Sequence, residues 1–155
     1  MVKVFLKHSK IKGTGVFAKS SIKKNEKIFL FSNKIITIKH APGCHCIICK
    51  RCINIHKDRW LYPKKDSFGW NLNHSCSSNS YINRNSIYAL KNIKPGEEIT
   101  IDYSTTNIDK KWKMGCKCKS KNCRKIIRSV QFLPNSLFKK HKGHMPKFIE
   151  DNYNL

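Results

Sequence analysis

Two segments organise this chain: Asn73-His74-Ser75-Cys76 and, further along, Gly96-Glu97-Glu98-Ile99-Thr100-Ile101-Asp102-Tyr103. A third group follows them, Cys116-Lys117-Cys118 and then Cys123. Three cysteines are an incomplete set for a structural zinc ion, which takes four ligands in a tetrahedron. Cys76 is a lone upstream cysteine and the natural fourth ligand. We therefore expect a metal to tie residues 73–76 to the C-terminal region, with the pocket around Tyr103 built across that tie.

Length and composition predict one soluble domain. A chain of 155 residues can bury most of its apolar surface. No apolar run reaches the ~20 residues that a membrane-spanning helix needs, and residues 1–7 lack the apolar segment of a secretory signal. We expect an intracellular protein, cytoplasmic or chromatin-associated, whose eight cysteines bind metal rather than form disulfides.

The net charge of +23 has two interpretations. The first is a surface that lies on nucleic acid or on a chromatin-like particle. The second is compositional, because the chain is rich in Lys, Asn and Ile, the lysines are scattered, and arginine, the usual phosphate reader, is scarce. Either way, this charge repels free basic peptides and favours a substrate presented beside something acidic, such as DNA.

The other four cysteines cluster upstream, at Cys44, Cys46, Cys49 and Cys52. They suggest a second zinc site, while an iron–sulfur cluster or a loop of free thiols are the alternatives. We expect His45, inside the run, to face solvent.

Short apolar or alternating runs predict strands, beginning with an edge strand at Val2–Leu6. Further strands are expected within residues 12–18, 22–30, 35–38, 60–63, 87–90 and 98–101. Helical periodicity is nearly absent before Ile127. Phe132–Ser136 then predicts a short helix that Gly143 ends, and Pro146 opens another turn. We expect this tail to pack on the sheets, with a lid over the substrate channel as the alternative.

Taken together, Asn-His-Ser-Cys at 73–76, Gly-Glu-Glu-Ile-Thr-x-Asp-Tyr at 96–103 and Cys-x-Cys-x4-Cys at 116–123 resemble the SET-domain protein lysine methyltransferases with a post-SET zinc segment. The resemblance covers about residues 3–127. It implies a mainly β, SET-type fold, a β-clip of small sheets with a pseudoknot and short C-terminal helices. The implied organisation is a SET domain at 1–110 with a cysteine-rich insert at 41–58, a post-SET zinc segment at 111–128 and a helical tail at 129–155.

The resemblance also implies a reaction, methyl transfer from S-adenosylmethionine to the ε-amine of a protein lysine. A histone or another basic chromatin or nucleoid protein is the implied substrate class. Tyr103 would orient the amine, and the metal ligands would be Cys76, Cys116, Cys118 and Cys123. The candidate cofactor-binding residues are Lys12, Gly13, Thr14, Gly15, Tyr62, Asn73, His74 and Trp112, the last with a core position as an equal alternative.

Such a transfer needs a neutral amine. Deprotonating a lysine of pKa 10.4 at neutral pH costs about 4–5 kcal/mol. A narrow apolar channel disfavours the ammonium form, and alignment of amine and methyl supplies much of the rest.

Some positions depart from the family pattern. Ser78 stands where the family usually has Pro, and Trp70-Asn71 replaces an Arg-Phe-like pair. Ile101 occupies a position where many members carry Phe or Tyr, so we expect di- or trimethylation to be possible. The rival function is a non-catalytic zinc-containing module that binds nucleic acid or chromatin, which would have no use for Tyr103.

Overall fold

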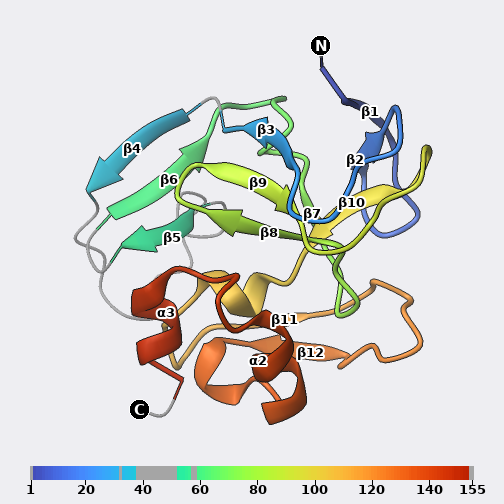
Figure 1. The fold of residues 1–155 in the computed structure, drawn as a ribbon. Helices are drawn as coiled ribbons and strands as arrows, with labels where there is room; N and C mark the ends of the chain where they lie inside the picture. Colours follow the sequence, from blue (N-terminus) through green and yellow to red (C-terminus); the bar gives the residue numbers. More distant parts are fainter. Residues whose placement is uncertain (1, 32, 38–51, 57–58, 154–155) are drawn as a thin grey trace.

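The computed structural model describes residues 2–31, 33–37, 52–56 and 59–153. It confirms the expected mainly β fold, in which small sheets are followed by a C-terminal part with two short helices (Figure 1). Among the described residues, no helix is long and apolar enough to span a bilayer.

One sheet brings the two organising segments side by side. Its strand order is β1-β2-β10-β7, with bounds Val4–His8, Thr14–Ala18, Glu98–Ile101 and Asn73–His74. β7 pairs parallel with β10, so that Thr100 lies opposite Asn73 and Ile101 opposite His74. Val16 and Ile99 face each other across β2 and β10 and are fully buried. Their burial supplies the apolar contact that fixes this register.

Two three-stranded sheets complete the upper part of the molecule. The first has the order β3-β9-β8, with bounds Lys27–Leu30, Ser86–Ala89 and Ser80–Asn83. The second has the order β4-β6-β5, with bounds Asn33–Thr37, Arg59–Pro63 and Ile53–His56. The sequence signals did not reveal β5 and β8. The main apolar core lies between these sheets and includes Leu61, Ile87 and Ile99.

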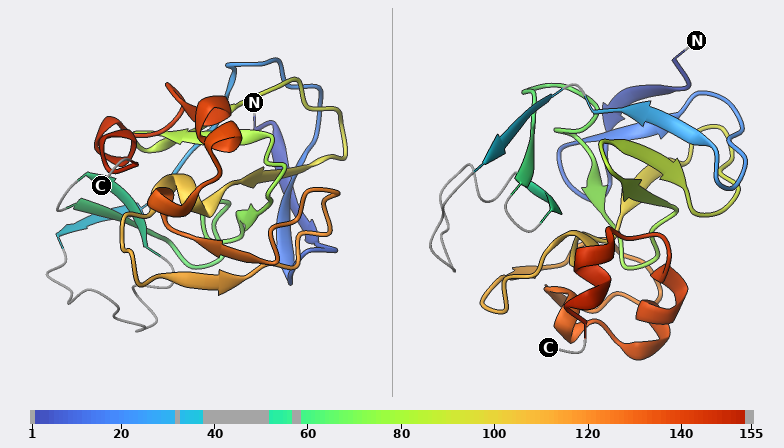
Figure 2. Two further views of the ribbon diagram at one scale, coloured as in Figure 1. Left: turned by 90° about the horizontal axis from the view of Figure 1, so that it is seen from below. Right: turned by 60° about the vertical axis from the view of Figure 1, so that its left-hand side comes forward.

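The C-terminal third begins with a 3-10 turn, η1 (Tyr103–Thr106), directly after β10. A two-stranded ribbon follows, β11 (Lys113–Gly115) with β12 (Ile126–Arg128), and then a second 3-10 turn, η2 (Val130–Phe132). Figure 2 shows this ribbon and the chain after it gathered on one side of the sheets.

The tail forms two helices, α2 (Asn135–His141) and α3 (Lys147–Asp151). Pro134 and Pro146 precede them, where a missing backbone N–H costs nothing. Gly143 after α2 has a φ of +77°, a left-handed conformation that glycine adopts without strain. The tail has a small core of its own, and it contacts the sheets through His144 on Tyr81 and Phe148 near His56.

Candidate functional site

Tyr103 lies where the two halves of the molecule meet. It packs against both the main apolar core and a cluster formed by Cys76, Cys116, Cys118 and Ile127. Its hydroxyl donates to the Leu72 carbonyl oxygen at 2.6 Å, and its backbone N–H donates to His74 Nδ1 at 3.1 Å. The phenol hydroxyl is therefore held against the chain rather than turned to bulk water.

Asn73 joins the glycine-rich turn to the strand that precedes Tyr103. Its amide nitrogen lies 3.1 Å from the Lys12 carbonyl oxygen, 3.3 Å from that of Thr14 and 2.8 Å from Glu98 Oε1. Ser9 Oγ donates to the other carboxylate oxygen of Glu98 at 2.9 Å. These contacts bring residues 12–14, Asn73 and Glu98 to one place.

The two glycines of the turn are needed for different reasons. Gly13 has a φ of +51°, and a Cβ built there would meet nothing within 4 Å. A Cβ at Gly15 would lie 2.3 Å from Glu98 Oε1. Gly13 thus allows a left-handed backbone beside open space, whereas Gly15 makes room for the Glu98 carboxylate.

Asn79 holds β10 in place from the other side. Its Nδ2 donates to the Glu98 carbonyl oxygen at 2.9 Å, and its Oδ1 accepts from the Thr100 N–H at 2.9 Å. Sequence reasoning missed Glu98, Asn79 and Asp102 as site residues. Glu98 and Asp102 lie inside the motif at 96–103, and Asn79 lies three residues after Cys76; these positions were the only available signal.

The thiols form a buried cluster with metal-site dimensions. His74, Cys76, Cys116 and Cys118 each direct one ligand atom into a group whose members lie within 4.8 Å of one another. Cys76 Sγ is 3.7 Å from Cys116 Sγ. Two sulfurs bound to one tetrahedral zinc, at about 2.3 Å each, are separated by about 3.8 Å. Cys123 packs against the same cluster, with its thiol 3.8 Å from the Cys116 carbonyl oxygen. The residues present fit a zinc ion.

The ring of His74 is a hydrogen-bond donor in this cluster. Burial lowers its pKa to about 4, although Asp102 opposes the shift, so the ring is neutral near pH 7. Because Nδ1 accepts the Tyr103 N–H, the ring proton is on Nε2. Nε2 lies 3.3 Å from Cys76 Sγ and donates to it. In this tautomer the nitrogen has no lone pair for a metal.

The pKa values of the three buried thiols are shifted in different directions. Burial raises the pKa of Cys116. Burial also raises the pKa of Cys76, although the N–H groups of Arg124 act to lower it. Burial alone would also raise the pKa of Cys118, but hydrogen bonds from Ser120 and neighbouring groups lower it to about 6. A cluster with one readily ionised thiol is a favourable starting point for metal capture.

The remaining predicted residues lie at different places. Trp112 packs against the cysteine cluster, as Tyr103 also does. Tyr62 lies on β6 in another sheet, in edge contact with Trp70 at 6.2 Å between ring centroids. Cys52 is half-buried, whereas Cys44, His45, Cys46 and Cys49 lie outside the described residues.

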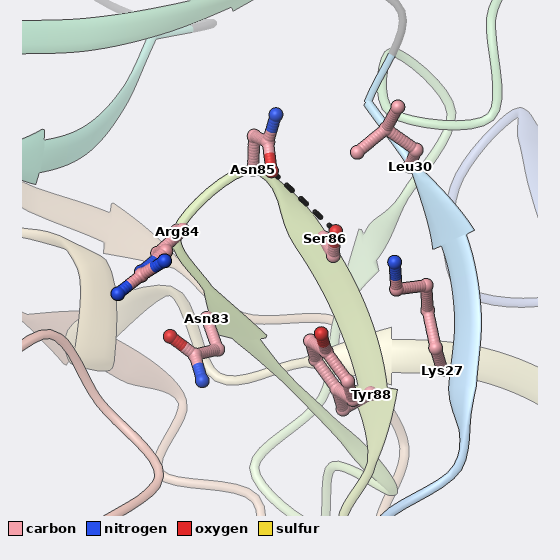
Figure 3. Close-up of a pocket in the computed structure, with 7 residues that line it drawn as sticks. All are labelled: Lys27, Leu30, Asn83, Arg84, Asn85, Ser86 and Tyr88. Carbon is pink, nitrogen blue, oxygen red and sulfur yellow. Dashed lines mark hydrogen bonds between the residues drawn. The ribbon is translucent and has the colours of Figure 1, made fainter.

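An open surface depression of about 370 Å³ lies on the β3-β9-β8 sheet (Figure 3). No predicted site residue lines it. Its walls carry two cations, amide and hydroxyl groups and no carboxylate: Lys27, Leu30, Asn83, Arg84, Asn85, Ser86 and Tyr88. It is thus separate from the Tyr103 region.

The SET domain family matches this chain over residues 13–104. The chain therefore belongs to the SET domain family, and the matched segment includes the glycine-rich turn, Asn73 and Tyr103. Cys116, Cys118 and Cys123 lie beyond it.

Three relatives have informative names. The variant-silencing SET domain-containing protein of Plasmodium falciparum is 29% identical over 88% of this chain. The histone-lysine N-methyltransferase trithorax of Drosophila virilis is 30% identical over 81%, and the H3 lysine-36 specific histone-lysine N-methyltransferase of Candida albicans is 26% identical over 81%. This chain spans only 7%, 4% and 16% of those proteins' lengths.

A solved structure is similar as well. It is a crystal structure of a candidate histone methyltransferase from Plasmodium falciparum, with a TM-score of 0.54 and 28% identity. The match covers 66% of this chain and 94% of that one.

Proposed function

We propose that this protein transfers a methyl group from S-adenosylmethionine to the ε-amine of a protein lysine. Family membership and the histone-lysine methyltransferases among its relatives support a methyltransferase. The observation that carries the proposal is the meeting of three motifs: Asn73 binds the turn at residues 12–14, and Tyr103 is hydrogen-bonded to Leu72 and His74 beside it.

The cofactor is assigned to the same place. Lys12, Gly13, Thr14 and Gly15 would hold it together with Asn73 and His74, using the open space beside Gly13. Trp112, packed on the same cysteine cluster as Tyr103, would close the site, while Tyr62 is a weaker candidate because no described contact joins it to Asn73. When bound, S-adenosylmethionine supplies an electrophilic methyl group on a sulfonium.

Tyr103 would orient the substrate amine. Its hydroxyl is fixed by the Leu72 carbonyl, so its remaining lone pairs can accept from a lysine N–H. Ile101, only 1% exposed, offers no hydroxyl to retain a water beside that amine. Di- or trimethylated product is therefore expected, and a mass spectrum with only monomethyl product after long incubation would contradict this assignment.

Zinc in this proposal is structural. Cys76, Cys116, Cys118 and Cys123 would bind it, since His74 donates its Nε2 proton to sulfur. The ion would join a SET domain at 1–110 to a post-SET segment at 111–128, with the tail at 129–155 packed on the same domain. A second metal site at Cys44, Cys46, Cys49 and Cys52 stays a prediction.

The substrate class follows from the relatives and from charge. A histone or another basic chromatin or nucleoid protein is the proposed substrate, which places the protein at chromatin. With a net charge of +23, the protein would meet a basic substrate most easily on a polyanion that neutralises both. The same charge favours the second candidate function, a non-catalytic module that binds nucleic acid.

The test compares wild type with Tyr103→Phe. Labelled methyl transfer from S-adenosylmethionine to a mixture of basic proteins should fall at least ten-fold in the variant. Tyr88→Phe is the matched control, because Tyr88 lies on β9, where its ring stacks on Tyr81 at 5.7 Å. Equal incorporation by wild type and Tyr103→Phe would remove the assigned role of Tyr103, and no incorporation by wild type on any basic substrate would favour the binding module.

A further inference from the structure

Arg124, directly after Cys123, connects two buried groups. Its Nη2 donates to both carboxylate oxygens of Asp102, at 2.6 and 2.7 Å, and its Nη1 donates to Ser104 Oγ at 3.2 Å. Asp102 is 1% exposed and precedes Tyr103 in the chain. One guanidinium nitrogen thus contacts both carboxylate oxygens, and such charge-assisted hydrogen bonds are stronger than neutral ones.

The same side chain also contacts the thiol cluster. Arg124 Nε lies 3.3 Å from Cys76 Sγ, and its backbone nitrogen lies 3.4 Å from that atom. Together with His74 Nε2, this sulfur faces three N–H donors. Groups that donate to a metal-binding atom from outside orient it and tune its affinity. These three contacts fix the position of the Cys76 sulfur.

Among the described residues, no other Lys or Arg forms an ion pair with Asp102. His74 Nδ1 is 3.6 Å from Asp102 Oδ1, but that nitrogen accepts the Tyr103 N–H. Asp102 also accepts the Ser104 N–H, which begins the η1 turn carrying Tyr103. The position of this turn thus depends on how Arg124 holds the Asp102 carboxylate.

We propose that Arg124 is a positioning residue that couples the cysteine cluster to Tyr103. One guanidinium holds the Cys76 sulfur and the Asp102 carboxylate in a fixed relation. Metal binding at the thiols therefore orders Asp102 and the start of η1, and loss of the metal releases them. The catalytic part rests on the proposed function, whereas the link between metal site and Asp102 stands without it.

The decisive variant is Asp102→Asn, because Asp102 has no described contact with any cysteine. Release of Zn²⁺ to a chromogenic chelator should become roughly ten- to a hundred-fold faster, as for other outer-shell partners of a metal. Arg124→Lys keeps the charge but loses the fork and Nε, and it should accelerate release similarly. The double variant should release Zn²⁺ no faster than the faster single variant, since both changes break one linkage.

Arg128→Lys is the matched control. Arg128 lies on β12 with its guanidinium 3.4 Å from the centroid of the Phe132 ring. This variant should release Zn²⁺ at the wild-type rate. Wild-type release rates for Asp102→Asn, or strictly multiplicative effects in the double variant, would overturn the coupling.

A measurement on wild type alone covers the case in which the variants do not fold. The Tyr103 N–H donates to His74 Nδ1, so its hydrogen exchange reports on the start of η1. Removal of Zn²⁺ should increase exchange at Tyr103 by at least ten-fold and leave Val16, fully buried in the main core, unchanged. Unchanged exchange at Tyr103 would refute the link, whether or not the protein methylates lysine. If it does methylate, Arg124→Lys should lower kcat more than it raises KM for the cofactor.

Discussion

At position 15, only the hydrogen side chain of glycine leaves room for a neighbouring carboxylate. The space next to its Cα is occupied by the Glu98 carboxylate, which also binds Asn73 and Ser9. A Gly-x-Gly turn is a weak sequence signal on its own. Spacing could indicate that glycine was needed here, but only the fold reveals that Glu98 is the reason.

The change Gly15→Ala should therefore weaken the site. The new methyl group must displace Glu98 Oε1, which costs about 1–3 kcal/mol for a crowded position. We expect a lower melting temperature and at least ten-fold weaker binding of S-adenosylmethionine in calorimetry. Gly115→Ala is the control, since a Cβ there meets nothing within 4 Å. Wild-type affinity in Gly15→Ala would show that the carboxylate position is unimportant for the cofactor.

His141 is a residue whose behaviour the sequence did not indicate. It is 1% exposed, and neither ring nitrogen has a hydrogen-bond partner among the described residues. Burial lowers its pKa to about 4, with Asp102 acting in the opposite direction. Below pH 6.5 the unfolded chain binds a proton that the folded protein does not bind. The stability that the neutral ring contributes is therefore present above pH 6.5 and lost as pH falls towards 4.

This linkage has a measurable slope. The free energy of unfolding should fall by up to about 1.4 kcal/mol per pH unit on account of His141 as pH falls from 6.5 to 4. Urea titrations of wild type and His141→Gln measure it, because the difference between the two proteins isolates this residue. The variant should show the shallower dependence. Parallel curves would mean that His141 titrates normally in the folded protein.

At the scale of elements, strands with strong apolar patterns were predictable and short polar strands were not. β8 begins with Ser80, whose side chain is buried. Its hydroxyl is satisfied there because it donates to the Thr100 carbonyl oxygen. β7 consists of two residues that exist as a strand only through pairing with β10. Such elements are set by tertiary hydrogen bonds, which leave no periodicity in the sequence.

The same limit applies to the site. The motif spacing predicted that Cys76 lies with Cys116 and Cys118, and in the structure these thiols lie close together. Nothing in the spacing indicated that His74 would join them, or that Arg124 would bridge Cys76 and Asp102. Side-chain direction decides these contacts, and it follows from the three-dimensional register.

The C-terminal tail gives a prediction at this scale. Ile149 on α3 is fully buried in the tail's own core, beside Val130 and Met145. Ile149→Ala should lower the free energy of unfolding by about 2–5 kcal/mol through a cavity. Leu30→Ala, at a side chain 58% exposed, should change it little. If the tail is a packing element, KM for substrate stays constant in Ile149→Ala, and a several-fold rise in KM would favour the lid.

For the whole molecule, the excess of positive charge is the dominant property. Most described acidic side chains are engaged within the chain, such as Glu26 with Lys3, Asp102 with Arg124 and Asp151 with Lys147. They do little to neutralise the many exposed lysines. The electrostatic field of a chain with net charge +23 therefore attracts negatively charged partners.

The protein should accordingly bind duplex DNA without sequence preference. Neutralising roughly 6–10 phosphates would make the affinity fall about 10³- to 10⁵-fold between ~50 and ~200 mM salt. Fluorescence anisotropy with two unrelated duplexes measures both the slope and the lack of preference. Absence of binding at the lower salt concentration would support the compositional interpretation of the charge.

In the proposed mechanism, one metal at Cys76 and the later thiols keeps Tyr103 beside the cofactor site. This role of the metal can be measured as methyl transfer by one sample before chelation, after complete removal of Zn²⁺ and after its return. We expect transfer to be lost with the metal and restored by Zn²⁺. Transfer at the original rate by protein shown to contain no metal would contradict it.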